Sequence, residues 1–114
     1  MVGWSIFLLL FVSVPPFLSY GHQTKGKQTF TDGMAKGAIA LNCLEALATV
    51  ILFKSSHAPF ALLFAGCMWA SQLYYMIKAA LMVGRPLVVT KKGQRVTLLW
   101  AIWHIAFVLI LAYA

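Results

Sequence analysis

The last nineteen residues of the chain, 96 to 114, read VTLLWAIWHIAFVLILAYA and contain no Lys, Arg, Asp or Glu. About 20 predominantly apolar residues are enough for a helix to span a bilayer. Residues 1 to 24 and 55 to 77 are likewise free of these charged types, and residues 37 to 53 contain only Glu45. We therefore predict four transmembrane helices, at about 4–20, 37–53, 58–77 and 96–114.

The composition excludes an ordinary soluble domain. Hydrophobic residues make up 62% of the 114 residues and charged residues 10%, whereas soluble domains average roughly 45–50% and about 25%. Too few residues remain outside the predicted spans for a soluble catalytic domain. We expect one all-α integral membrane domain, residues 1–114, in which four helices form a small antiparallel bundle and the first is kinked by Pro15-Pro16.

The positive residues predict the orientation of this bundle. Four spans place loops 21–36 and 78–95 on one side, and the 54–57 turn with both termini on the other. Lys54 is alone on the second side, and the first side carries Lys25, Lys27, Lys36, Lys78, Arg85, Lys91, Lys92 and Arg95. Because Lys and Arg favour the inner side, both termini are expected on the outer (lumenal or intermembrane) side.

The first segment has alternative interpretations. Ser19 to Gly21 resembles a signal-peptidase site, but no basic residue precedes the apolar run, so we expect the segment to be retained. Pro15-Pro16 removes two backbone donors, which leaves open a three-span topology with this segment in the interface.

Short-range signals predict the ends of the helices. Thr31 or Asp32 is expected to cap the second helix. Ser55-Ser56, with Pro59, is expected to begin the third helix, which forms a tight hairpin with the second, and Gly84 to end it. Residues 87–90 are expected to form a short strand and residues 91–93 a turn.

Polar side chains inside membrane spans are costly and often functional. Glu45 and His104 each lie eight residues in from the basic end of their helix, about 12 Å deep, and we expect them to form an ion pair or a hydrogen bond with a protonated Glu45. This cluster is either a structural network or a ligand or proton site. Its predicted members are Asn42, Glu45, Gln72 and His104, with Thr49 on the face of the second helix and Thr97 and Trp100 on that of the fourth.

Other chemistry is not indicated. Cys43 and Cys67 have no clustered His or acidic ligands beside them, so neither a metal site nor a disulfide is expected. His22 and His57 fall in loops, which disfavours a bis-histidine haem and leaves a single pigment on His104 open. We predict no catalytic residue, no enzyme activity and no cofactor.

The basic residues beside the last two helices suit anionic lipid headgroups, where each contributes about 1 kcal/mol. We expect them to set the topology and to contact lipids such as cardiolipin. Nucleic-acid binding is not expected, because Phe30 is the only aromatic residue in these loops. The residues in question are Lys78, Arg85, Lys91, Lys92 and Arg95.

Residues 41–48, LNCLEALA, followed by a short turn with Pro59 and an Ala-rich third span, resemble the DoxX-like small four-helix membrane proteins. The resemblance covers residues 38–70 and implies that Glu45 faces the bundle interior. The Gly and Lys that this family carries near the end of its first span are absent, since Pro15-Pro16 and Gly21-His22 stand there.

With so little mass outside the bilayer, the chain is expected to be a non-catalytic accessory subunit of a large multi-subunit membrane complex, of the respiratory-chain or another energy-converting type. Its expected partners are other membrane subunits and anionic lipids. The mitochondrial inner membrane is favoured over a bacterial inner or thylakoid membrane. The alternative is a free-standing carrier, or a lipid-, quinone- or proton-binding protein that uses Glu45 and His104.

Overall fold

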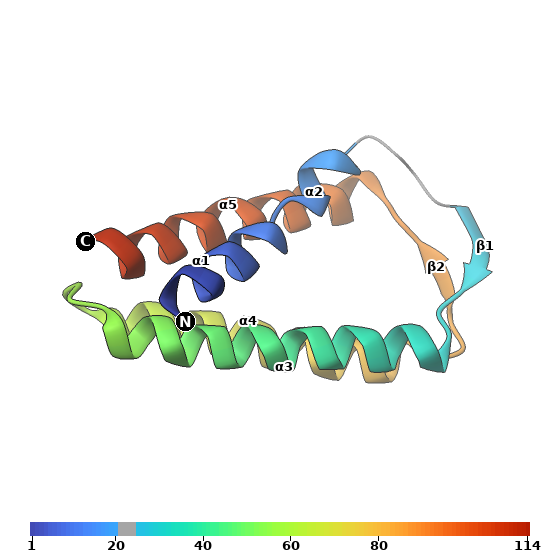
Figure 1. The fold of residues 1–114 in the computed structure, drawn as a ribbon. Helices are drawn as coiled ribbons and strands as arrows, with labels where there is room; N and C mark the ends of the chain where they lie inside the picture. The colour runs from blue at the N-terminus through green and yellow to red at the C-terminus, as the bar shows by residue number, and fades with distance from the viewer. Residues whose placement is uncertain (21–24) are drawn as a thin grey trace.

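The computed structural model describes residues 1–20 and 25–114 and is predominantly α-helical (Figure 1). Both termini lie toward the end that carries the α3–α4 turn, and the two strands lie at the other end, as expected for the predicted bundle. The elements in chain order are α1 (Val2–Phe11), α2 (Pro15–Leu18), β1 (Lys25–Thr29), α3 (Asp32–Ser55), α4 (Ala61–Leu81), β2 (Pro86–Val88) and α5 (Lys91–Tyr113).

Two of the described helices, α3 and α5, are long and apolar enough to cross a membrane. Only 28% of the apolar window of α3 and 22% of that of α5 are buried within the protein. A core helix of a soluble protein would be mostly buried, because exposed apolar surface is unfavourable in water. These two helices therefore support a membrane location.

The first apolar segment is not one kinked helix over residues 4–20, as predicted, but two short helices. α1 ends at Phe11, and Pro15-Pro16 forms the start of α2. Proline lacks an N–H group and its ring clashes with the preceding turn, so the hydrogen bonds of α1 cannot continue through it. α1 packs mainly on α3, whereas α2 packs on α5.

The long helices extend beyond the predicted spans at the strand end. α3 begins at Asp32, and Thr31 Oγ1 accepts from Met34 N at 3.1 Å, which confirms Thr31 as the cap. α5 begins at Lys91, and Thr90 Oγ1 accepts from Gly93 N at 3.0 Å. Residues 91–93 are therefore the first turn of α5, and the prediction of a separate turn there was wrong.

The third helix also differs from its predicted bounds of 58–77. α4 begins three residues later, at Ala61, after Phe60 takes a left-handed conformation with φ of 59°, and it continues to Leu81. α3 and α4 form the most extensive helix pair, which confirms the predicted hairpin. Trp69 Nε1 joins the two helices by donating to Ala46 O at 3.3 Å.

Over the described residues, the fold is all-helical apart from one small two-stranded antiparallel sheet, which joins the segments predicted as loops 21–36 and 78–95. β2 lies close to the strand predicted at 87–90, but β1 falls in a region predicted to be loop. Next to the strands, Phe30 N donates to Arg85 O at 2.9 Å and Gly84 N donates to Phe30 O at 2.8 Å. The sheet thus ties the segment before α3 to the segment after α4.

The hydrophobic core occupies the half of the bundle nearest the termini. α1 contributes Leu9, and Phe64 of α4 packs edge to face on Phe107 of α5 with centroids 4.9 Å apart. Because α1 ends at Phe11, it does not cover the strand-side half of α3. The buried residues of this core are Leu9, Ala48, Leu52, Ala65, Met68, Val108 and Leu111.

The backbone conformations of Gly84, which connects α4 to the sheet, and Gly66, within α4, predict opposite effects on stability when each is replaced by Ala. Gly84 has φ of +83°, whereas Gly66 is helical, and a Cβ at either position meets no atom within 4 Å. Gly84→Ala is therefore expected to lower the free energy of unfolding by about 1–2 kcal/mol, and Gly66→Ala to raise it by about 0.5–1 kcal/mol. Thermal melts of the two detergent-solubilised variants would check this, and equal shifts in both would contradict the assigned backbone conformation of Gly84.

Candidate functional site

The four polar residues predicted inside the spans are all buried, and they come from three helices. The exposed fractions are 9% for Asn42, 4% for Glu45, 3% for Gln72 and 1% for His104. A polar group buried in apolar surroundings is stable only when it is hydrogen-bonded. The partners of these side chains therefore determine what the cluster can do.

His104 does not pair with Glu45, so that prediction was wrong. His104 Nδ1 lies 2.8 Å from Ser13 Oγ, and Ser13 Oγ also lies 3.1 Å from Leu9 O. With its single hydrogen donated to Leu9, the Ser13 hydroxyl accepts from Nδ1–H of His104. No hydrogen bond or ion pair joins Glu45 to His104 in the described part of the chain.

Ser13 reaches His104 because the chain breaks between α1 and α2. It lies in the short connection that follows Phe11, where the backbone turns from α3 toward α5. The His104 ring is further held by Trp100, which stacks on it at 4.9 Å and 26°. His104 Nε2 is left buried without a partner.

Gln72 is bonded to Thr49 and not to Asn42. Gln72 Nε2 donates to Thr49 Oγ1 at 2.9 Å, and Thr49 Oγ1 donates to the backbone carbonyl of Glu45 at 2.8 Å. These bonds join α4 to α3. Gln72 Oε1 is buried and has no partner.

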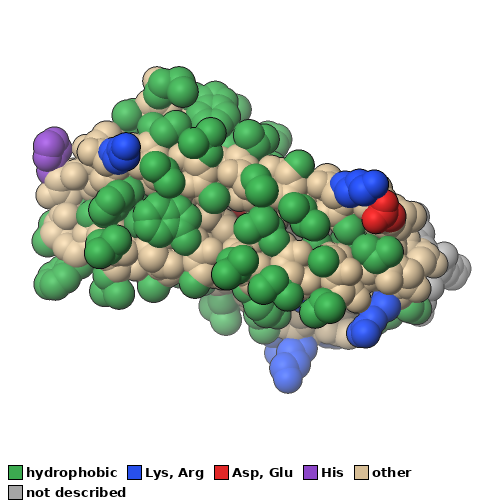
Figure 2. Space-filling view, turned by 90° about the horizontal axis from the view of Figure 1, so that it is seen from below, with side chains coloured by type: hydrophobic (Ala, Val, Ile, Leu, Met, Phe, Trp, Pro, Cys, Tyr) green, Lys and Arg blue, Asp and Glu red, His purple; other side chains and the backbone are tan. Residues whose placement is uncertain are grey.

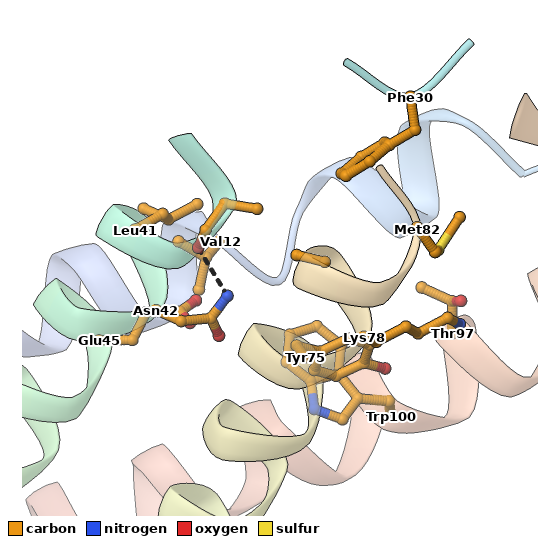
Figure 3. A pocket seen from close by; sticks show the side chains of 12 residues that line it. Val12, Phe30, Leu41, Asn42, Glu45, Tyr75, Lys78, Met82, Thr97 and Trp100 are labelled. Atoms are coloured by element: carbon orange, nitrogen blue, oxygen red, sulfur yellow. Dashed lines mark hydrogen bonds between the residues drawn. The ribbon is translucent and has the colours of Figure 1, made fainter. Parts of the chain in front are cut away.

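A cleft of about 330 Å³ opens in the strand-side half of the bundle, where α1 no longer covers α3 (Figure 3). Figure 3 shows side chains of α3 on one side of this cleft and side chains of α4 and α5 on the other. Its lining is mostly apolar with a few polar groups, which is typical of small-molecule sites. The lining residues are Val12, Phe30, Ala38, Leu41, Asn42, Glu45, Tyr75, Lys78, Ala79, Met82, Thr97 and Trp100.

The faces of α3 and α5 that carry the predicted polar residues lie opposite each other and are separated by this cleft. Asn42 and Glu45 line it from α3, and Thr97 and Trp100 line it from α5. Thr49 and His104 are fully buried beside other side chains and do not line it.

The carboxyl group of Glu45 is the chemically distinctive group of the cleft. The residue as a whole is 4% exposed, and its carboxyl group has no hydrogen-bond or ion-pair partner among the described residues. Asn42 Nδ2 donates to Ala38 O at 2.8 Å, which leaves Asn42 Oδ1 as a second acceptor. The cleft therefore contains two oxygen sites that the protein does not satisfy.

Sequence reasoning missed Tyr75, which lines the cleft, and Ser13, which bonds His104, as well as the contacts of Trp100. Trp100 Nε1 donates to Ser71 Oγ at 2.7 Å, and Tyr75 packs edge to face on Trp100 with centroids 5.5 Å apart. Ser13 and Tyr75 carried no signal, because an isolated Ser or Tyr in an apolar run is common. Only the double proline two residues after Ser13 marked its surroundings as irregular.

The predicted lipid-contacting residues gather at the strand end of the bundle. Lys78 is in the last turn of α4, with Nζ 6.0 Å from the Tyr74 ring, and its side chain also lines the cleft. The other members of the predicted set, which are all exposed, are Arg85, Lys91, Lys92 and Arg95.

The two cysteines are free, and Cys43 Sγ lies 3.8 Å from Met76 Sδ. Within residues 1–20 and 25–114, no three or more His, Cys, Asp or Glu side chains are placed to hold a metal ion. His22, which was considered as a haem ligand, lies outside the described residues.

The chain matches no known protein family, no curated protein and no solved structure. The resemblance of residues 38–70 to DoxX-like proteins therefore receives no support from these comparisons.

The contact between Ser13 and His104 predicts unequal effects for two serine substitutions. Ser13 and Ser19 both donate to a carbonyl four residues earlier, but Ser19 is exposed. Ser13→Ala leaves both ring nitrogens of His104 unpaired in the interior and is expected to cost about 1–3 kcal/mol. Ser19→Ala should change stability by less than about 0.5 kcal/mol. Unfolding melts in one detergent would compare the two variants; equal stabilities would contradict the Ser13–His104 bond.

Proposed function

We propose that this chain is a non-catalytic integral membrane protein with four spans, which serves as an accessory subunit of a larger membrane complex. The preferred setting is a respiratory-chain or other energy-converting complex of the mitochondrial inner membrane. The distribution of Lys and Arg would fit a bacterial inner or thylakoid membrane equally well. The proposal rests on one observation, the apolar surface that the chain leaves exposed on all its long helices.

Both α4 and α5 contribute exposed apolar side chains to this surface. Leu62 is 65% exposed and Leu73 is 55% exposed on α4, and Leu99 is 65% exposed and Ile102 is 51% exposed on α5. Figure 2, seen from below, shows hydrophobic side chains along the face formed by α3 and α4, with Lys and Arg side chains mainly toward one end. Such a surface is stable against lipid or against the helices of other subunits.

The count of four spans is supported by two further helical segments. α4 has 21 residues, and its only charged residue, Lys78, is near its end, where a long side chain reaches the interface. The segment Val2–Leu18 is apolar but broken. Both termini lie toward the same end of the bundle, as an even number of spans requires.

A free-standing carrier or binding protein for a lipid, a quinone or a proton is the second candidate. The observation that favours it is the cleft beside Glu45, since a purely structural subunit has no need of a buried, unpaired carboxyl group. His104 is no longer part of this candidate site, because its ring is bonded to Ser13.

The accessory role and the free-standing role differ in whether the chain is assembled into a large complex. The accessory role predicts that the chain, solubilised from its source membrane in mild detergent, migrates on native electrophoresis in a band of several hundred kilodaltons with known subunits. Mass spectrometry of each band would identify both the chain and its companions. Migration alone or as a small homo-oligomer would reject the accessory role and favour the second candidate.

The topology makes a separate prediction about accessibility. In a Cys43→Ala/Cys67→Ala background, we expect His57→Cys to react with an impermeant maleimide from the outer side and Val89→Cys from the inner side, because both positions are exposed at opposite ends of the bundle. Val2→Cys should label like His57→Cys if the first segment spans. Labelling of Val2→Cys from the inner side would establish three spans.

A further inference from the structure

We propose that the cleft binds the head of an uncharged, ring-headed amphiphile that carries hydroxyl or carbonyl oxygens, which is the chemistry of a quinol. This inference rests on the membrane location proposed above and not on assembly into a complex. It deepens the role of the Glu45 cleft and holds whether the chain acts alone or as a subunit.

The size of the cleft limits the ligand. Its volume of about 330 Å³ is at the lower limit of small-molecule sites. A single substituted ring fits such a space, whereas the two acyl chains of a phospholipid do not. A tail attached to the ring would leave the cleft sideways, past Leu41, which lines the cleft and is 41% exposed.

The unpaired polar groups of the cleft are hydrogen-bond acceptors, so they favour a ligand that donates hydrogen bonds. The Glu45 carboxyl group is deep in the cleft without a protein partner, and Asn42 Oδ1 is one helical turn nearer the strand end. Neither group is among the fully enclosed unpaired atoms, which are Gln72 Oε1 and His104 Nε2, so both are accessible to a ligand from the cleft. Ring hydroxyl groups would satisfy both acceptors.

The charges of the walls favour a neutral head. Glu45 disfavours an anion inside the cleft, and Lys78, on the opposite wall, disfavours a cation. A head with both donor and acceptor oxygens interacts with each wall and loses no charge solvation on entering an apolar site.

The aromatic residues give the cleft fixed walls. Trp100 is held by its bond to Ser71 and by its stacking on His104, and Tyr75 packs against its edge. Flat rings pack well on aromatic walls. Figure 3 shows Tyr75 and Trp100 on the side of the cleft opposite Asn42 and Glu45, so a ring between them contacts both the aromatic and the polar side.

The test is equilibrium binding to the purified full chain in phosphatidylcholine nanodiscs, with empty nanodiscs as the partition control. The probes are decylhydroquinone kept reduced under nitrogen, decylammonium and decyl phosphate. We expect saturable binding of decylhydroquinone, with an affinity at least about tenfold higher than that of either charged probe. Tighter binding of a charged probe would overturn the proposed ligand class.

Two pairs of variants locate the site. Ala38 lines the cleft and is partly exposed, whereas Ala40 is exposed on another face of α3. Ala38→Phe should weaken binding of decylhydroquinone at least about tenfold, and Ala40→Phe less than about twofold. If Ala38→Phe fails to fold, the same comparison can be made on α5. Thr97→Phe should then weaken binding, and Leu99→Phe, at an exposed position, is its control. Unchanged binding in a folded cleft variant would overturn the site.

Glu45 distinguishes a neutral ligand from a cation. Glu45→Gln keeps an acceptor oxygen and should change the affinity for decylhydroquinone less than about threefold, while Glu45→Leu should weaken it at least about tenfold. An equal loss in both variants would show that the ligand needs the negative charge. Alkaline extraction of the source membranes tests the membrane location separately: binding that fails for a membrane-resident chain overturns this inference alone.

Discussion

Pro15 and Pro16 impose the constraint on which the rest of the structure depends. They prevent a 17-residue apolar segment, Val2–Leu18, from forming one continuous helix. The chain uses the resulting break to change partners, because α1 packs on α3 and α2 packs on α5. Three features follow from this change: the core is concentrated near the termini, Ser13 is brought to His104, and the strand-side half of α3 is uncovered.

The polar side chains of this chain are mostly satisfied within their own helix. Six hydroxyl or amide groups donate to the carbonyl four residues earlier, so these donors do not need an acceptor on another helix. Among the described residues, Gln72 Oε1 and His104 Nε2 are buried without a partner, whereas the Glu45 carboxyl group and Asn42 Oδ1 line the cleft without one. The locally bonded residues are Ser5, Ser13, Ser19, Asn42, Thr49 and Thr97.

Local signals in the sequence were sufficient to predict the hairpin of α3 and α4 and the role of Thr31 as the cap of α3. These features depend on residues close together in the chain, and hydrophobic runs locate them directly. The burial of Asn42, Glu45, Gln72 and His104 was also predictable, because an apolar chain in lipid directs its few polar side chains inward.

The pairing of these residues was not predictable from depth along the helices. Glu45 and His104 lie at the same depth along their helices, but the hydrogen-bond partner of His104 is Ser13, which the proline break turns toward it. β1 was missed for a similar reason. Its residues, KGKQT, show no apolar alternation, and the strand forms because Phe30, Gly84 and Arg85 bond the two connections together.

In the proposed topology, helix length places the strand end of the bundle beyond the hydrocarbon core. α3 has 24 residues and α5 has 23, or about 35 Å each at 1.5 Å per residue, compared with a hydrocarbon core of about 30 Å. The excess is at the strand end, where Lys36 pairs with Asp32 at 3.0 Å on the surface of α3 and where α5 begins with Lys91 and Lys92.

In the proposed orientation, the strands and the first turns of α3 and α5 therefore lie among the headgroups. Glu45 is thirteen residues after Asp32, about 20 Å along the helix by the same rise, whereas Lys78 and Phe30 lie at the mouth of the cleft. The cleft thus runs from the headgroup layer toward the middle of the bilayer. A buried acid at the inner end of such a cleft is reached most readily by a neutral molecule that is already dissolved in the lipid. A water-soluble cation would first have to pass the positive residues of the strand end, and an anion would be repelled by Glu45 itself.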